Sequence, residues 1–192
     1  MPRPNQARER VLDAAAELLA SRGLKHLNTN ALATQAGVTP PTVYRYFNNK
    51  EAVVIALAER FIEAEKAWLA DAETELHQAT DAATAACLLI DQYWLSARQQ
   101  RGIVALRGAM RVWPELKAIE EASLVNSTKL VSALLGPLLP AHSKRDARRI
   151  SRYIVELVCS TVDRCYPLAD REQTWRMKEL KQTVTAYLRS HA

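Results

Sequence analysis

Residues 28–47 decide the fold that we predict for this chain, and they read NTNALATQAGVTPPTVYRYF. Their first half predicts a short helix, because Asn28 is a favourable N-cap residue and apolar side chains recur at helical spacing from Leu32 to Ala36. Gly37 should end this helix, since glycine readily adopts the left-handed conformation found at helix C-termini. We expect a tight reversal of the chain at this point.

The second half of the stretch predicts another short helix after a turn over residues 37–39. Thr39 is again a favourable N-cap residue, and the two prolines that follow, Pro40 and Pro41, suit a first helical turn because an N–H group there would have no helical partner. This helix should continue to about Tyr46. Two short helices joined in this way have the geometry of a helix-turn-helix.

The second helix of this motif should carry an unusual outward surface. We expect Val43 and Phe47 to be buried, which leaves hydroxyl, guanidinium and ammonium groups facing outward. These groups can bond the phosphate oxygens and base edges of a DNA duplex. The side chains expected in this surface are Thr42, Tyr44, Arg45, Tyr46 and, just beyond the helix, Lys50. The alternatives are a packing role for Tyr44 and a merely solvated position for Arg45 and Tyr46.

The composition of the whole chain favours an all-α protein. Of its 192 residues, 48% are hydrophobic, which is enough to form a sizeable core and argues against disorder. Only 5 residues are glycine, and no sustained alternation of β-branched residues predicts a strand. We therefore expect helices along the rest of the chain.

Helical periodicity and end signals place these other helices. The helix before the motif should end near Ser21 or Arg22, where Gly23 follows, and a long amphipathic helix should begin at about Lys50 and continue through the seventies. Further helices are predicted at about residues 81–100, 103–112, 114–135, 144–166 and 171–190, with Pro114, Ser143 and Asp170 as start signals.

Basic residues are concentrated at the N-terminal end of the chain. Residues 1–50 contain seven Lys and Arg against three Asp and Glu, a net charge of +4, whereas the whole chain has a net charge of +5. Such an end attracts polyanions, and this attraction is non-specific. The charge distribution therefore supports a nucleic-acid partner for the motif.

Over about residues 8–60 the sequence resembles the tetracycline-repressor (TetR) family of bacterial regulators. The order, spacing and type of the matching residues agree together. The matching segments are Arg8–Gly23, Leu32-Ala33-x-x-Ala36-Gly37-Val38-Thr39, Thr42-Val43-Tyr44-Arg45-Tyr46-Phe47 and Asn49-Lys50-Glu51-Ala52. The resemblance implies a three-helix DNA-binding domain over residues 1–50 and a larger helical domain for ligand binding and dimerisation over residues 51–192.

The same resemblance implies roles for individual residues. Those that would bind DNA phosphates are Tyr44, Tyr46 and Lys50, assisted by Thr39. Those that would lie in or beside the major groove are Thr42 and Arg45, while Thr29 and Asn30 would contact the backbone and a base. Two departures from the family pattern are Ala31, which removes a capping box, and the Pro40-Pro41 pair, which offers no donor to a base.

Two apolar stripes near the C-terminus are candidates for a dimer interface. Each stripe has helical spacing, so two adjacent helices could pair with their copies about a two-fold axis and match a roughly palindromic operator. The residues expected in this interface are Ile154, Leu157, Val158, Thr161, Val162, Trp175, Leu180 and Val184. An intramolecular core is the alternative explanation of the same stripes.

Aromatic and adaptable side chains between these regions are candidates for the wall of a ligand pocket. They lie on different predicted helices and could surround an apolar cavity. The candidates are Phe61, Trp68, Tyr93, Trp94, Met110 and Trp113, with Arg107 available to neutralise an acidic ligand. Core packing would explain these aromatic residues equally well, and a solvated helix face would explain Arg107.

The remaining features indicate a soluble, cytoplasmic protein. The first ten residues are polar and Arg-rich, unlike a secretory signal, and the most apolar run, Leu130–Leu139, is shorter than the roughly 20 residues of a membrane span. The three cysteines, Cys87, Cys159 and Cys165, cannot all pair within one chain, which favours a reducing compartment. We expect them to be core residues, with redox sensing by Cys159 or Cys165 as the alternative.

No motif for catalysis stands out, so we expect neither enzymatic activity nor a cofactor or metal site. A Gly-rich phosphate loop and a zinc-protease histidine pair are both missing from the sequence. The function we predict is a homodimeric repressor that a small molecule releases from operator DNA through a population shift. The alternatives are a DNA-bound protein that organises chromosomes or cell division without a ligand, and a helical ligand-binding adaptor.

Overall fold

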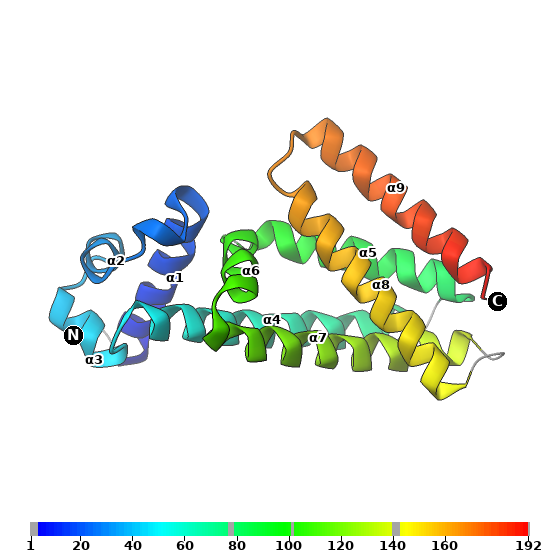
Figure 1. Ribbon diagram of the computed structural model, residues 1–192, viewed down its shortest axis with the longest axis horizontal. Coiled ribbons are helices and arrows are strands. Elements are labelled where there is room, and N and C mark those ends of the chain that lie inside the picture. Colours follow the sequence, from blue (N-terminus) through cyan, green and yellow to red (C-terminus); the bar gives the residue numbers. More distant parts are fainter. Residues whose placement is uncertain (1–3, 77–78, 101, 140–142, 192) are drawn as a thin grey trace. The chain divides into compact units, whose positions relative to one another are not determined.

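The structure, a computed structural model, describes residues 4–76, 79–100, 102–139 and 143–191 (Figure 1). These residues form α-helices and two 3-10 helices, and they contain no β-strand. The α-helices are α1 (Pro4–Arg22), α2 (Thr29–Ala36), α3 (Pro40–Tyr46), α4 (Lys50–Leu76), α5 (Ala82–Gln99), α6 (Ile103–Val112), α7 (Pro114–Leu135), α8 (Lys144–Cys165) and α9 (Asp170–Arg189), and the 3-10 helices are η1 (Leu24–His26) and η2 (Gly136–Leu138). The all-α prediction is confirmed.

The helix ends lie close to their predicted positions because the end signals act locally. Asn28 caps α2 by accepting a hydrogen bond from the Ala31 amide at 3.0 Å, and Ser143 caps α8 through the Asp146 amide at 3.2 Å. The two 3-10 helices were not predicted. Each has only three residues, too few for a hydrophobic period to appear in the sequence.

The chain divides into two compact units, and the division differs from the boundary predicted after residue 50. Unit 1 comprises Met1–Ala64 and Gln100–Glu120, and unit 2 comprises Glu65–Gln99 and Glu121–Ala192. The difference arises because the first turns of α4 and the whole of α6 contribute buried side chains to the core around α1. The sequence pattern shows that these helices are amphipathic, but not which helices they pack against.

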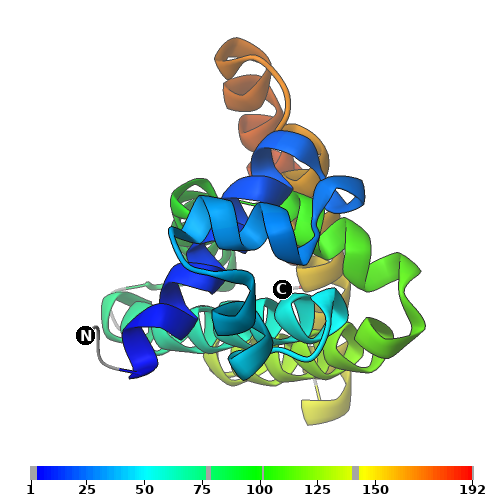
Figure 2. The same cartoon turned by 90° about the vertical axis from the view of Figure 1, so that its left-hand side faces the viewer.

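Unit 1 is built around α1, which packs against α2, α3 and α6. Figure 2 looks onto this unit and shows α1, α2 and α3 gathered around one another in blue to cyan. Leu12 and Leu32 are completely buried between these helices. Arg60 of α4 adds an ion pair to Asp13 of α1 at 2.7 Å, close to the unit's surface.

Unit 2 consists of one part of α4 together with α5, α7, α8 and α9, and its core is rich in alanine and branched residues. Helix α5 packs along α9, and α8 also packs against α9, as Figure 1 shows. Lys181 of α9 forms an ion pair with Asp91 of α5 at 2.5 Å. Across the described part of the chain, none of the helices has the length and apolar character required to cross a membrane.

The packing of α8 and α9 changes the interpretation of the predicted dimer residues. The chain itself buries Ile154, Val158, Val162, Leu180 and Val184 in the core of unit 2, so the intramolecular alternative accounts for these five residues. Of the other three, Trp175 is 55% exposed, whereas Leu157 and Thr161 are half-buried. The helical spacing correctly indicated an apolar face, but it could not indicate whether the same chain or a second copy covers that face.

The reversal between α2 and α3 depends on Gly37. Its backbone is left-handed, with a φ of 62°, and its amide donates to the Thr34 carbonyl at 3.2 Å. Arg10 of α1 reaches across and donates a hydrogen bond to the Gly37 carbonyl at 3.1 Å. The positive φ requires glycine, and a Cβ atom here would lie 2.6 Å from the Arg10 guanidinium, which would have to move away from the turn.

We predict that Gly37→Ala lowers the free energy of unfolding by about 1–2 kcal/mol, because alanine is strained in the left-handed region and displaces Arg10. Urea denaturation measures the change. Gly108→Ala is the matched control, since Gly108 lies within α6, a methyl group there would have no neighbour within 4 Å, and the variant should gain about 0.5–1 kcal/mol. Equal effects of the two substitutions would contradict this account of the turn.

Candidate nucleic-acid interface

The turn after Gly37 gives α3 its starting direction. Thr39 is extended and occupies the N-cap position, and Pro40 and Pro41 fill the first helical positions as predicted. Because these prolines have no amide hydrogen, the first amide of the helix is that of Thr42, which donates to the Thr39 carbonyl at 2.9 Å. The hydroxyl groups of Thr39 and Thr42 lie 2.9 Å apart, so the two side chains pair with each other instead of capping the backbone.

Helix α3 has an inner and an outer side, as the sequence predicted. Val43 and Phe47 are buried, with 1% and 4% exposure, and they anchor the helix in the core of unit 1. On the outer side, Tyr44 is 55% exposed and Arg45 is also exposed. A tyrosine with this much exposed ring surface is not a packing residue of this unit, so the packing alternative for Tyr44 loses support.

Arg45 is exposed and pairs with Tyr46, which is half-buried and packs against the core of unit 1, so the prediction of an outward Tyr46 holds only in part. The Arg45 guanidinium donates a hydrogen bond to the Tyr46 hydroxyl at 2.7 Å and lies 4.8 Å from the centroid of the Tyr46 ring. Since an arginine has five N–H donors, this single bond leaves others directed to the outside.

Lys50 lies at the first residue of α4, just beyond α3. The Asn49 side chain accepts a hydrogen bond from the Ala52 amide at 2.8 Å and so caps α4, a role that was not predicted because the Asn48-Asn49 pair indicated only a break between helices. The Lys50 ammonium lies 4.0 Å from the Glu51 carboxylate and 5.9 Å from the centroid of the Trp113 ring. Trp113, a predicted pocket residue, therefore lies beside this surface in unit 1.

All eight predicted DNA-contacting residues belong to unit 1 and lie within residues 29–50. Thr29 and Asn30 begin α2, where Thr29 is half-buried and Asn30 is exposed. Residues 28–50 contain two cations, Arg45 and Lys50, and no Asp or Glu, and the adjoining carboxylate is that of Glu51, 4.0 Å from the Lys50 ammonium. The surface offers hydroxyl, amide, guanidinium and ammonium donors, which suit phosphate oxygens and base edges.

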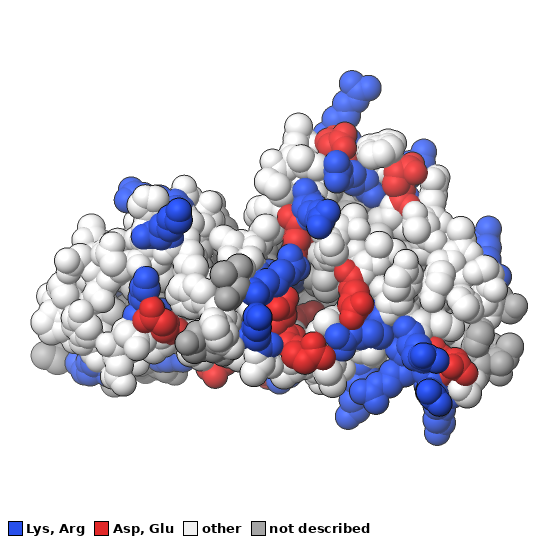
Figure 3. Space-filling view, in the orientation of Figure 1, with Lys and Arg blue, Asp and Glu red and all other residues white. Residues whose placement is uncertain are grey.

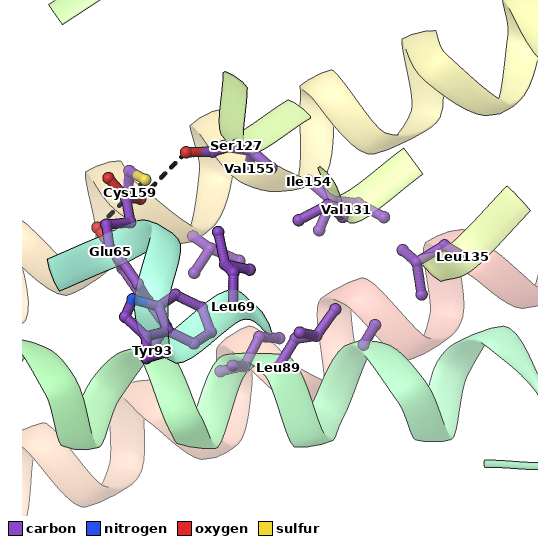
Figure 4. A pocket seen from close by; sticks show the side chains of 14 residues that line it. Glu65, Leu69, Leu89, Tyr93, Ser127, Val131, Leu135, Ile154, Val155 and Cys159 are labelled. Atoms are coloured by element: carbon purple, nitrogen blue, oxygen red, sulfur yellow. Dashed lines mark hydrogen bonds between the residues drawn. The ribbon is translucent and has the colours of Figure 1, made fainter. Parts of the chain in front are cut away.

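A second candidate site is a small cavity within unit 2, shown in Figure 4. Its volume is about 50 Å³, and its wall is almost entirely carbon. The lining residues are Glu65, Trp68, Leu69, Ala86, Leu89, Ile90, Tyr93, Ser127, Val131, Leu135, Ile154, Val155, Val158 and Cys159. They come from α4, α5, α7 and α8, so the cavity is enclosed by four helices of one unit.

The structure brings only part of the predicted pocket together. Trp68 and Tyr93 line the cavity, with ring centroids 5.9 Å apart, and Trp94 packs against the same core without lining it. Phe61, Arg107, Met110 and Trp113 belong to unit 1, where the Arg107 guanidinium lies 5.6 Å from the centroid of the Phe61 ring. The sequence pattern does not indicate which of the two units an aromatic residue will pack into, so the prediction combined residues of both.

The polar groups near the cavity were not predicted. Glu65 accepts hydrogen bonds from the Ser127 and Ser123 hydroxyls, each at 3.1 Å, and the Tyr93 hydroxyl donates to the Cys159 sulfur at 3.2 Å. Figure 4 shows Glu65, Ser127 and Cys159 at one end of the view and Val131 and Leu135 at the other. These residues lie on different helices, so no local spacing could have indicated them.

The three cysteines are free thiols in the structure. Cys165 is buried, and the removal of its thiol from water raises its pKa, which disfavours the reactive thiolate. Cys87 and Cys159 are half-buried, with Cys87 lying 3.5 Å from the Thr185 hydroxyl. This environment favours the prediction of packing residues over that of a redox sensor at Cys165.

Comparison with known proteins identifies a family that the N-terminal part of the chain matches. Residues 11–57 match the family described as bacterial regulatory proteins, tetR family. A solved TetR-family transcriptional regulator from Streptomyces coelicolor has 27% sequence identity and a TM-score of 0.69, and the match covers 97% of this chain and 99% of that one. Over residues 11–57 the chain matches the tetR family. The resemblance inferred from the sequence is confirmed.

Two further relatives are matched over only part of their length. The transcriptional regulator YvdT of Bacillus subtilis is 29% identical over 107 residues, which are 55% of this chain and 54% of YvdT. The class D tetracycline repressor protein of Escherichia coli is 47% identical over 51 residues, 27% of this chain and 23% of the repressor. This chain thus spans about half the length of YvdT and about a quarter of the repressor in these matches.

One solved structure with the same fold contains a ligand. The transcriptional regulator FadR from Bacillus subtilis, in complex with stearoyl-CoA, has a TM-score of 0.73 and 21% identity, and the match covers 96% of this chain and 98% of FadR. At this identity the similarity demonstrates a shared fold. The fold therefore extends through both units, beyond the residues matched by the family.

Proposed function

We propose that this protein is a cytoplasmic, non-enzymatic repressor that binds operator DNA through α3 and leaves it when a small apolar molecule occupies the cavity of unit 2. One observation carries the DNA-binding part. Helix α3 is anchored by two buried side chains, Val43 and Phe47, while its other side presents donors from an exposed surface that has no acidic residue within the motif. A rigid polar helix of this kind suits the major groove.

The side chains of this surface divide into two groups by their expected partners. Tyr44 and Lys50 are exposed and would hold the phosphate backbone, which fixes the register of the protein without reading sequence. Arg45 and Thr42 would read base edges, since a guanidinium can donate two hydrogen bonds to a guanine. Because the two prolines at the start of α3 offer no hydrogen-bond donor to a base, base recognition by this helix would depend on Arg45 and Thr42.

The release step rests on the cavity. Its volume of about 50 Å³ is far below the several hundred cubic ångströms of typical ligand pockets, so an effector larger than a few atoms must displace side chains as it enters. Such a ligand binds the enlarged form more tightly and shifts the population toward it. The carbon wall favours an apolar ligand, and the binding of stearoyl-CoA by the similarly folded FadR supports this choice.

We also propose that the protein acts as a homodimer. Two copies would place two recognition helices on successive major grooves of a roughly palindromic operator. The exposed part of α9 around Trp175 is the candidate contact, because a tryptophan that is 55% exposed leaves a large apolar ring in water.

The DNA-binding proposal predicts two different classes of variant. Lys50→Ala and Tyr44→Ala should weaken binding to all duplexes, and Lys50→Ala should lower the slope of log K against log salt by about 1 per protomer. Arg45→Ala and Thr42→Ala should mainly reduce the preference for operator over random DNA, by about 1–3 kcal/mol for Arg45. Fluorescence anisotropy at several salt concentrations, with DNA from upstream of the protein's own gene, measures both quantities.

Lys25→Ala is the control for these measurements, because Lys25 is an exposed cation of η1 outside the proposed surface. It should leave sequence preference unchanged. Loss of preference to the same degree in all four variants would show that the contacts are assigned wrongly. Absence of any DNA binding at low salt would refute the function.

The cavity proposal predicts that Ala86→Leu abolishes the binding of small apolar molecules. Ala86 is 1% exposed and lines the cavity, so a leucine side chain should fill the space. Benzene, as a probe, should raise the melting temperature of the wild type and leave that of the variant unchanged. Ala122→Leu on the exposed side of α7 adds the same volume and should keep the response. An unaltered benzene response in Ala86→Leu would argue against the cavity.

The dimer proposal predicts that Trp175→Ala raises the dimer dissociation constant at least tenfold, because truncation of a central aromatic side chain costs about 2 kcal/mol or more. Analytical ultracentrifugation measures the constant. Tyr44→Ala is a matched control, since Tyr44 is also 55% exposed and lies in unit 1. A dimer equally stable in both variants would place the interface elsewhere.

A further inference from the structure

A second, larger hollow lies on the surface of unit 2, between α7 and α8. Its volume is about 790 Å³, which falls within the range of small-molecule sites. The residues that line it are Val125, Thr128, Lys144, Arg145, Arg148, Arg149, Arg152, Tyr153 and Glu156. We call it the α7–α8 groove. In Figure 3, Lys and Arg side chains gather over the start of α8, at the lower right of the view.

Four cations of this groove have no anionic partner among the described residues. Lys144, Arg145, Arg148 and Arg149 are exposed, and no hydrogen bond or ion pair within the described part of the chain engages their side chains. Residues four apart on a helix lie side by side, so Lys144 faces Arg148 and Arg145 faces Arg149. Such like-charge pairs destabilise a helix, and a bound anion would relieve the repulsion.

Arg152 sets one boundary of this charged surface. It donates hydrogen bonds to both carboxylate oxygens of Glu121 on α7, at 3.3 and 3.4 Å, and to Glu156 one turn further along α8. The positive surface therefore ends in two carboxylates. A long polyanion that continued past Arg152 would meet these negative charges, whereas a compact anion would stay on the four cations.

An apolar wall lies beside the cations. Tyr153 is 52% exposed and is held in position by the ring of Tyr187, with centroids 5.1 Å apart, and Val125 of α7 is 39% exposed. A positioned aromatic ring next to several arginines is suited to a ligand that has both a planar group and phosphates, because rings stack and guanidinium groups bond phosphate oxygens in pairs.

We propose that the α7–α8 groove binds a nucleotide-sized phosphorylated molecule, with its phosphates on Lys144, Arg145, Arg148 and Arg149 and its planar group against Tyr153. The volume of the groove, its unpaired positive charge, its acidic boundary and its aromatic wall favour the same class of ligand. This site is separate from the cavity and from α3, and the proposal depends on neither of them.

Isothermal titration calorimetry on the full chain, in buffer without divalent cations, tests the proposal with ATP, inorganic tripolyphosphate and adenosine. We expect ATP to bind most tightly, tripolyphosphate more weakly and adenosine without measurable heat. The double variant Arg148→Ala, Arg149→Ala should lower the affinity for ATP at least tenfold. Tyr153→Ala should reduce the affinity for ATP to that for tripolyphosphate, because only the planar group loses its contact.

The control double variant is Lys25→Ala, Lys117→Ala, which removes two exposed cations of unit 1 and should change the affinity for ATP less than twofold. The arginine double variant should keep or raise the wild-type melting temperature, since both side chains are exposed and their removal relieves the like-charge repulsion. If the wild type fails to bind ATP, or if the arginine variant binds it as tightly as the control, the proposal is wrong. A variant that loses affinity only for non-operator duplex DNA would likewise overturn it and assign the surface to DNA.

Discussion

The left-handed backbone at Gly37 is the constraint on which the candidate interface depends. The direction of α3 is set within three residues of this point, and Arg10 of α1 holds the carbonyl group of the turn at 3.1 Å. A side chain at residue 37 would strain the backbone and displace Arg10 at the same time. The turn is thus a tertiary junction between α1, α2 and α3.

Because this junction is rigid, the polar groups on α3 are held in fixed positions, which favours recognition of a partner. Val43 and Phe47 are embedded in the core of unit 1, so the helix has little freedom to rotate. The outward groups are therefore positioned before a partner arrives, which reduces the entropy lost on binding. The Arg45–Tyr46 hydrogen bond further restricts a long, flexible side chain.

Unit 2 uses α7 and α8 for two different environments. Their inner sides contribute Val131 and Ile154 to an apolar cavity, whereas the groove between them receives its arginines from α8 and Val125 from α7. Helix periodicity makes this possible, since residues only one or two positions apart on a helix point to different sides. A single pair of helices therefore presents one surface to apolar groups and another to anions.

The amino-acid sequence alone specified the helices, their ends and the two-sided character of α3, because caps, prolines and hydrophobic periods act over a few neighbouring residues. The same local rules identified Tyr44, Arg45 and Lys50 as surface groups, whereas Thr42 is half-buried. The packing of helices against one another was needed to establish that α6 joins α1, that Glu65 and Ser127 meet beside a cavity, and that the stripe including Val158 is core. These outcomes depend on which helix faces pack together, and the spacing of residues along one helix carries no information about its partner.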